Sequence, residues 1–286
     1  MKPISTPWPA AFYRSLFQNW RVRGHMRLGA WMSRLFPSMQ NVAVPHHAGQ
    51  LHLDLRDLDQ QRIFLDGGVK AEPGEVALVQ TLVKSGNIVM DVGAHLGVYS
   101  TMLAELVGPS GVVLAYEPHP TMLYVNAIPY QQLIIRPFAV SEQEGAIGFA
   151  SDRSSALSHV STTNISTSNL KSVTLDQEVA RLRLPQVDFL KIDVEGHEEF
   201  ALRGASKLLT SDSPPVLLFE FVPFFRPRWK QGAIQTLQKM LKPGWAGLAM
   251  GFDGTKKEWN DWSEAAANTN YLLIPPHRSE LLRELQ

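Results

Sequence analysis

The sequence contains no cysteine among its 286 residues, which excludes a disulfide scaffold, a thiolate metal site and a cysteine nucleophile. It also lacks any run of about 18 or more apolar residues, so we predict no transmembrane helix. Lysine and arginine together number 27, as do aspartate and glutamate, and the net charge is therefore zero. No overall basic field would attract nucleic acid, and we predict no nucleic-acid partner. The absence of cysteine fits a reducing compartment, and we expect a cytoplasmic protein.

Acidic residues are missing from the N-terminal part of the chain, where the first acid is Asp54. Aromatic and aliphatic side chains recur there at helical spacing, without the continuous apolar segment of a signal peptide. We expect residues 1–50 to form a basic helical extension that packs on the main domain or on a second copy in a homo-oligomer. The alternative is a basic amphipathic helix lying on the inner, anionic surface of a membrane. The basic residues before the first acid are Lys2, Arg14, Arg21, Arg23, Arg27 and Arg34.

Strand-like and helix-like segments alternate over residues 51–286, which we treat as one α/β domain. This alternation predicts a mainly parallel sheet with helices on both faces, and such sheets bind ligands at the carboxyl ends of their strands. The expected strands are 51–55, 62–65, 88–92, 112–116, 133–138, 146–150, 171–174, 187–192, 216–221, 245–251 and 271–274. The expected helices are 73–84, 97–107, one from residue 120, 176–183, 197–209 and 231–241.

The strongest local signal is NIVMDVGAHLGVYS at residues 87–100, where a buried strand runs into a turn containing Gly93 and Gly97. The next strand ends in Glu117, and an acid at that position can accept hydrogen bonds from both hydroxyls of a ribose. Asp91 would repel a pyrophosphate but would attract an ammonium group, and the loop lacks the full G-x-G-x-x-G spacing. The two acids favour S-adenosylmethionine over NAD. A nucleotide-dependent Rossmann oxidoreductase remains the weaker alternative.

The second signal is VDFLKIDVEGHEEFALRGA at residues 187–205, where another strand runs into a helix. Acids crowded at one turn cost free energy unless a cation lies among them. That cation could be Lys191, a metal ion or a cationic cofactor. The titratable residues around this turn are Lys191, Asp193, Glu195, His197 and Glu198.

Together these segments resemble the FkbM family of S-adenosylmethionine-dependent methyltransferases. The matching pieces are VMDVGAHLGVYS, AYEPHP, AVSEQEG, VTLDQEV, FLKIDVEGHEEFALRGA and PPVLLFEF, in the order and at the spacing of the family. The resemblance covers about residues 70 to 222. It implies a class I methyltransferase fold, which is a Rossmann-like sheet of seven strands with one antiparallel strand near its edge.

The resemblance also implies a cofactor site and an activity. The family commonly has Asn where this chain has His95, and both residue types tolerate a left-handed backbone. Members are mostly O-methyltransferases, so we expect methylation of a hydroxyl on a sugar, glycan or natural product. A catalytically inactive, cofactor-binding scaffold is the alternative. The implied cofactor-binding residues are Asp91, Gly93, Ala94, His95, Gly97, Glu117, Val140, Ser141 and Asp193.

An alcohol is a weak nucleophile at neutral pH, so a base or a metal should assist the reaction. Asp193 is our first choice as the base, because it follows the strand that borders the cofactor. His197 has the more suitable intrinsic pKa but lies on the helix beyond. Glu220 ends the next strand and could join Asp193 and Lys191 in one pocket. The two carboxylates could instead hold Mg²⁺, and the sequence leaves both alternatives open.

Overall fold

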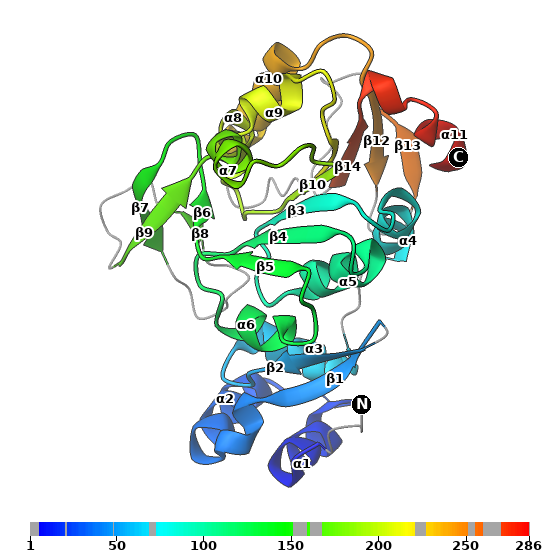
Figure 1. Cartoon of the computed structure of the whole chain (residues 1–286). Coiled ribbons are helices and arrows are strands. Elements are labelled where there is room, and N and C mark those ends of the chain that lie inside the picture. Colours follow the sequence, from blue (N-terminus) through cyan, green and yellow to red (C-terminus); the bar gives the residue numbers. More distant parts are fainter. Residues whose placement is uncertain are drawn as a thin grey trace.

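The computed structural model describes residues 6–20, 22–47, 49–68, 73–150, 159–160, 168–220, 227–250, 255–259 and 270–285. The centre of this part of the chain is an eight-stranded sheet in the order β13-β12-β14-β11-β10-β3-β4-β5 (Figure 1). Its strands are β3 (Ile88–Val92), β4 (Val112–Tyr116), β5 (Leu133–Arg136), β10 (Phe189–Ile192), β11 (Val216–Phe219), β12 (Ala246–Met250), β13 (Lys256–Glu258) and β14 (Asn270–Ile274).

The directions of the strands confirm the predicted fold class. Strands β5, β4, β3, β10 and β11 are parallel to one another, whereas β14 runs antiparallel to both β11 and β12. Seven strands with one reversed near the edge form the class I methyltransferase sheet that the sequence predicted. Strand β13 pairs antiparallel with β12 and adds an eighth.

Helices cover both faces of this sheet, which explains why its central strands are apolar along their whole length. Successive side chains of a strand point to opposite faces, so Val89 and Met90 of β3 enter two different hydrophobic cores. One core receives α4 (Pro73–Leu82), α5 (Val98–Val107), α6 (Thr121–Ala127) and α11 (Leu281–Leu285), which follows η4 (Pro276–Arg278). The other receives α7 (Leu175–Leu182), α8 (Glu198–Arg203), α9 (Ser206–Thr210) and α10 (Pro227–Met240).

The helix predicted over 197–209 is two helices, α8 and α9, with a break at Gly204. The break brings the chain so close to a neighbouring strand end that a Cβ on Gly204 would lie 2.1 Å from the carbonyl oxygen of Ser141. Ser141 directly follows β6, which belongs to a second, smaller sheet in the order β6-β9-β7-β8. Its strands are β6 (Ala139–Val140), β7 (Gly145–Ala150), β8 (His159–Val160) and β9 (Ser168–Val173). Most of the polar loop predicted between β7 and β9 lies outside the described residues.

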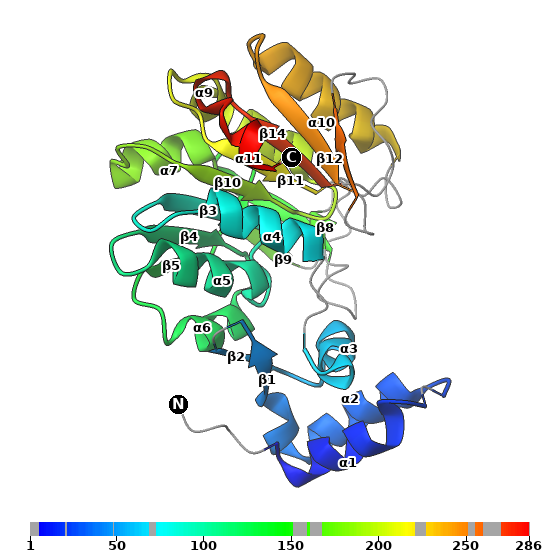
Figure 2. The ribbon, with the colours of Figure 1, turned by 90° about the vertical axis from the view of Figure 1, so that its right-hand side faces the viewer.

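The N-terminal segment has its own hydrophobic core, and Figure 2 shows it stacked on one end of the sheet domain. Its strands form an antiparallel hairpin, and the predicted domain boundary at residue 50 falls inside that hairpin. The division into an extension and a catalytic domain stays a prediction. The elements of this N-terminal unit are α1 (Trp8–Phe17), α2 (His25–Leu35), η1 (Pro37–Gln40), β1 (Val42–His46), β2 (Gly49–Leu53) and α3 (Leu58–Asp66).

The short strand predicted at 62–65 is wrong, because these residues belong to α3. The Asp57 side chain accepts hydrogen bonds from the N–H groups of Asp59 and Gln60, both at 3.0 Å, and so begins the helix. Gly67, with a φ of 83°, ends it. Among the described residues, no helix combines the length and the apolar composition needed to cross a membrane.

Candidate cofactor site and carboxylate cluster

The glycine loop leaves β3 in a turn that only glycine fits. Gly93 has a φ of 87°, and a Cβ built there would lie 1.7 Å from the carbonyl oxygen of Asp193. The N–H groups of Gly93 and Ala94 both donate to the carbonyl oxygen of Tyr116 at 3.0 Å. The loop is therefore held between the carboxyl ends of β4 and β10, and a close backbone approach of this kind is typical of a ligand-binding turn.

His95 and Glu117 meet at the outer side of this loop. His95 has a φ of 50°, so the left-handed backbone expected at this position is present. Its N–H donates to Glu117 Oε2 at 2.9 Å, and the N–H of His119 donates to Glu117 Oε1 at 2.9 Å. Gly97, with a φ of 97°, then leads into α5. The structure therefore brings together the predicted loop and the predicted strand-end acid.

Asp91 lies beneath the loop and is 1% exposed. Ser100 donates a hydrogen bond to its Oδ2 at 2.5 Å, whereas Oδ1 is buried without a hydrogen-bond partner among the described residues. Burial raises the pKa of Asp91, and the positive charge of Lys191 partly offsets this shift. A buried polar atom left without a partner is uncommon and indicates a missing polar ligand or water.

Val140 and Ser141 are buried, and Ser141 contacts His197 at the start of α8. The Nε2 atom of His197 lies 3.1 Å from Ser141 Oγ, and the imidazole stacks on Phe200 with ring centroids 4.6 Å apart. The residue is 4% exposed. Its surroundings are those of a packing residue at the start of a helix, and its catalytic role stays a prediction.

Lys191 supplies the cation that the crowded acids require. Its Nζ donates to Asp193 Oδ2 at 2.7 Å and lies 4.5 Å from the ring centroid of Tyr99. Burial by itself lowers the pKa of Lys191, but the surrounding carboxylates, above all Asp193, raise it by more. Lys191 therefore stays charged although it is buried. Its position favours an electrostatic role over that of a proton donor.

Three carboxylates form a cluster beside this ion pair. Oxygen atoms of Asp193, Glu195 and Glu220 all lie within 4.8 Å of one another, and Asp193 and Glu220 are hydrogen-bonded. The charge on Asp193 and burial raise the pKa of Glu220 far above its usual range. Burial also raises the pKa of Asp193, but the charge of Lys191 and the hydrogen bonds from Glu220 and Lys191 together outweigh burial and lower this pKa below its usual value. At neutral pH the pair therefore contains an ionised Asp193 and a protonated Glu220.

Glu195 is the member of this cluster to which the sequence assigned no role. It has a φ of 51°, and burial followed by the charge of Asp193 raises its pKa to about 8. A non-glycine residue in the left-handed region is uncommon, and such residues are enriched at functional sites. The crowded KIDVEG segment was the sequence signal, although it could not show which acid turns toward Asp193.

An amide side chain joins the N-terminal unit to the glycine loop. Asn126 of α6 is 1% exposed, and its Oδ1 accepts a hydrogen bond from the N–H of His52 at 2.7 Å. Its Nδ2 donates to the carbonyl oxygens of His52 at 3.1 Å and Leu96 at 2.8 Å. The Leu96 side chain is in turn part of the N-terminal core. We call this connection, made by Asn126, His52 and Leu96, the Asn126 clamp.

Several solved methyltransferase structures overlap with this chain at low identity. The O-methyltransferase from Bacillus cereus in complex with SAH is 14% identical, and the overlap covers 93% of this chain and 97% of that one with a TM-score of 0.44. The SAM-dependent O-methyltransferase from Thermotoga maritima is 14% identical, with 82% and 86% covered and a TM-score of 0.41. Aeropyrum pernix fibrillarin, solved with S-adenosyl-L-methionine, is 11% identical, with 70% and 73% covered and a TM-score of 0.40.

The comparison with curated proteins found no match. The family comparison is decisive instead, because the model of the methyltransferase FkbM domain matches residues 91–252, which is more than half of the chain. The matched region contains the glycine loop, the acid of β4 and the carboxylate cluster. This chain therefore belongs to the FkbM methyltransferase family and is an S-adenosylmethionine-dependent methyltransferase.

Proposed function

We propose that the enzyme methylates a hydroxyl group on a small acceptor, either a sugar, a glycan or a natural product. The observation that carries this proposal is the cluster of Asp193, Glu195 and Glu220 at the carboxyl edge of the sheet, next to the glycine loop. An alcohol must lose its proton as it attacks, and a carboxylate beside the methyl donor is suited to accept that proton.

The residues of the loop fit S-adenosylmethionine. When bound, this cofactor supplies a methyl group on a positively charged sulfur. We assign the partnerless Oδ1 of Asp91 to the ammonium side of the cofactor, either directly or through water. Glu117 receives one N–H on each oxygen, and a carboxylate has further lone pairs for the two ribose hydroxyls. Gly93 and Gly97 allow the backbone to approach the ligand, and Val140 and Ser141 would border the adenine.

We assign the role of general base to Asp193. Lys191 holds its carboxylate ionised, and the protonated Glu220 donates to it, so it is ready to accept a hydrogen bond from the acceptor hydroxyl. The proton would move to Asp193 as the hydroxyl oxygen takes the methyl group. His197 is less suited to this role because its Nε2 already faces Ser141 inside the protein.

A Mg²⁺ ion is the second candidate for activating the hydroxyl. The three carboxylates offer the oxygen ligands that Mg²⁺ prefers, and their spacing would allow one ion to contact them all. In that case the residues would bind the metal, and the metal would favour the deprotonated acceptor. The requirement for a metal stays a prediction.

The experiment is methyl transfer from S-adenosylmethionine labelled with tritium in the methyl group to a cell extract. We expect Asp193→Asn to lower the rate by about 10²–10⁴-fold at saturating cofactor, as loss of a general base does. His197→Ala should change the rate far less, and the exposed Asp212→Asn serves as the matched control. If His197→Ala alone shows the large loss, the base is His197. If a chelator abolishes transfer and added Mg²⁺ restores it, the metal candidate replaces the base.

A further inference from the structure

Within the described part of the chain, the helices α1 and α2 are partnered on one side only. Tyr13 of α1 is fully buried, and its hydroxyl donates to Gln61 of α3 at 2.7 Å. Met32 of α2 lies in the same core. Figure 2 shows α3 between this helix pair and the sheet. The contact with the rest of the protein therefore occupies the inner side of the helix pair. The outer side of the pair stays exposed.

The outer side carries large apolar residues in two regular stripes. On α1 the exposed residues are spaced by four, and on α2 by three and four, so each set lies along one face of its helix. Eight of the eleven large apolar side chains that are exposed in the described part of the chain belong to this segment. They are Trp8, Phe12, Leu16, Trp20, Val22, Leu28, Trp31 and Leu35, and Trp20 is the most exposed at 78%.

Positive charge accompanies these stripes. Arg23, Arg27 and Arg34 are exposed, and the first 53 residues contain no acid that would neutralise them. Indole rings prefer the boundary between water and hydrocarbon, because they are apolar with one polar tip. A helix with aromatic residues on one side and arginine among them is typical of a segment that lies on an anionic membrane.

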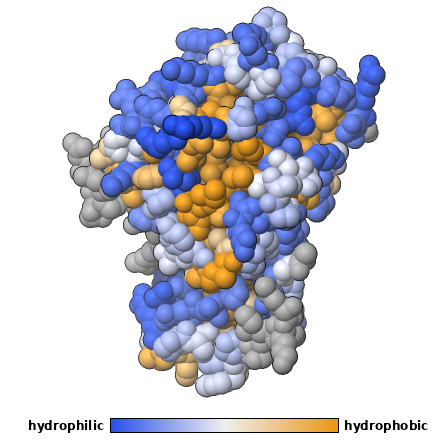
Figure 3. Space-filling model, viewed as in Figure 1, coloured by the Kyte–Doolittle hydropathy of each residue, from blue (hydrophilic) through white to orange (hydrophobic). Residues whose placement is uncertain are grey.

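The charge also decides between a membrane and a second copy of the chain. In a two-fold symmetric dimer the same surface meets itself, so the arginines of one copy would face those of the other. Such like-charge contacts oppose association, whereas phosphate groups of an anionic bilayer complement them. Figure 3 shows a separate band of hydrophobic residues higher on the molecule, on the face seen in Figure 1.

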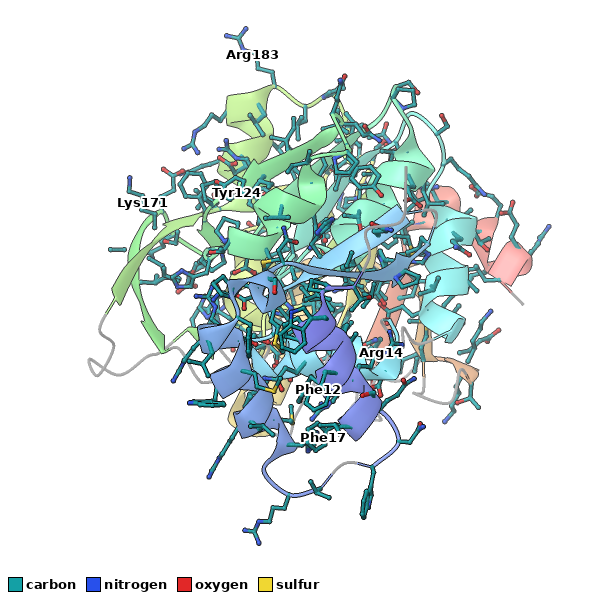
Figure 4. All side chains as sticks on the ribbon, turned by 90° about the horizontal axis from the view of Figure 1, so that it is seen from below. Phe12, Arg14, Phe17, Tyr124, Lys171 and Arg183 are labelled. Atoms are coloured by element: carbon teal, nitrogen blue, oxygen red, sulfur yellow. The ribbon has the colours of Figure 1, made fainter. Side chains whose placement is uncertain are left out.

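We propose that the outer side of α1 and α2 docks on the surface of an anionic phospholipid bilayer, with the aromatic side chains inserted at the headgroup level. This inference does not depend on the identity of the acceptor or on the catalytic base. Figure 4 views the molecule from the side that would face the membrane, with Phe12 on this side.

The test is co-sedimentation of the full-length protein with phosphatidylcholine vesicles, with and without phosphatidylglycerol. Full-length variants are needed because deletion of residues 1–40 would remove Tyr13 and Met39 from the N-terminal core. We expect binding to the anionic vesicles only, and weaker binding at high salt. The double variant Arg27→Gln/Arg34→Gln should bind about thirtyfold more weakly, and the control Lys171→Gln/Arg183→Gln should bind as the parent protein does.

A second pair of variants tests the aromatic residues. Phe12→Ala/Trp31→Ala should lose binding, whereas Tyr124→Ala/Ile128→Ala, which alters exposed side chains of α6 and of its C-cap, should retain it. Unchanged affinity for S-adenosylmethionine in calorimetry would show that each variant is folded. Three outcomes would overturn the proposal: no binding to anionic vesicles, equal effects of test and control variants, or light scattering that shows a dimer lost only in the Phe12→Ala/Trp31→Ala variant.

Discussion

The Gly93→Ala substitution tests how tightly the glycine loop is held against β10. The added Cβ would meet two penalties at once, namely a φ of 87° and a distance of 1.7 Å to the carbonyl oxygen of Asp193. The contact atom belongs to the backbone, so no side-chain rotation can relieve the overlap. Either the loop or the end of β10 must move, and both positions border the proposed cofactor site.

The magnitude follows from the two penalties. A residue with a Cβ in the left-handed region costs about 1–2 kcal/mol. Forcing an extra carbon into a packed site adds about 1–3 kcal/mol. We therefore expect Gly93→Ala to lower the free energy of unfolding by about 2–5 kcal/mol.

Gly24→Ala is the matched control, because Gly24 has a φ of 90° but no atom within 4 Å of its built Cβ. It should lose only the conformational part, about 1–2 kcal/mol. Urea unfolding of both variants gives the difference, and calorimetry gives their affinities for S-adenosylmethionine. Gly93→Ala should strongly weaken the binding of S-adenosylmethionine, and Gly24→Ala should not. Equal losses of stability, or a folded Gly93→Ala variant with normal affinity, would refute the proposed close approach.

Two further predictions concern the acids of the site. Glu117→Ala should weaken the binding of S-adenosylmethionine by about 1.5–3 kcal/mol, the value of a hydrogen bond to a charged group. Unchanged affinity in calorimetry would contradict the assignment of Glu117 to the ribose. Glu195→Gln should stabilise the fold at alkaline pH. The pKa of Glu195 is raised from 4.5 to about 8, so the folded state holds its proton more tightly and loses stability as pH rises through this range. Urea unfolding should show no gain for the variant below about pH 4.5 and a gain of about 1–3 kcal/mol at about pH 8, and a gain independent of pH would contradict the assignment.

The central sheet could be predicted from the sequence because its strands are short apolar runs that end in chemically distinctive residues. The positions of Asp91, Glu117 and Asp193 at the carboxyl edge could be predicted because each comes at the end of such a run. The strand β1 was missed, and residues 62–65 were assigned to a strand although they are helical. At 62–65 a short apolar pattern fits both structures, and only the cap formed by Asp57 decides between them.

Side-chain partners across the fold could not be predicted in the same way. The contact of His197 with Ser141 joins residues far apart in the chain, and no local pattern specifies it. Asn126 gave no signal either, since an asparagine in a helix is usually exposed and this one is buried. The mutual orientation of Asp193, Glu195 and Glu220 depends on the left-handed turn at Glu195, which sequence propensity disfavours.

The Asn126 clamp has a thermodynamic consequence. Because one amide holds both the carbonyl of Leu96 and the backbone of His52, the glycine loop and the β1–β2 hairpin share part of their stability. We therefore expect a ligand that orders the glycine loop to slow hydrogen exchange in the hairpin. The reverse also holds, because linkage is reciprocal: any factor by which docking of the N-terminal unit changes cofactor affinity is the factor by which the cofactor changes docking. Occupancy of the methyl-donor site would thereby be communicated to the opposite end of the molecule without a moving lid.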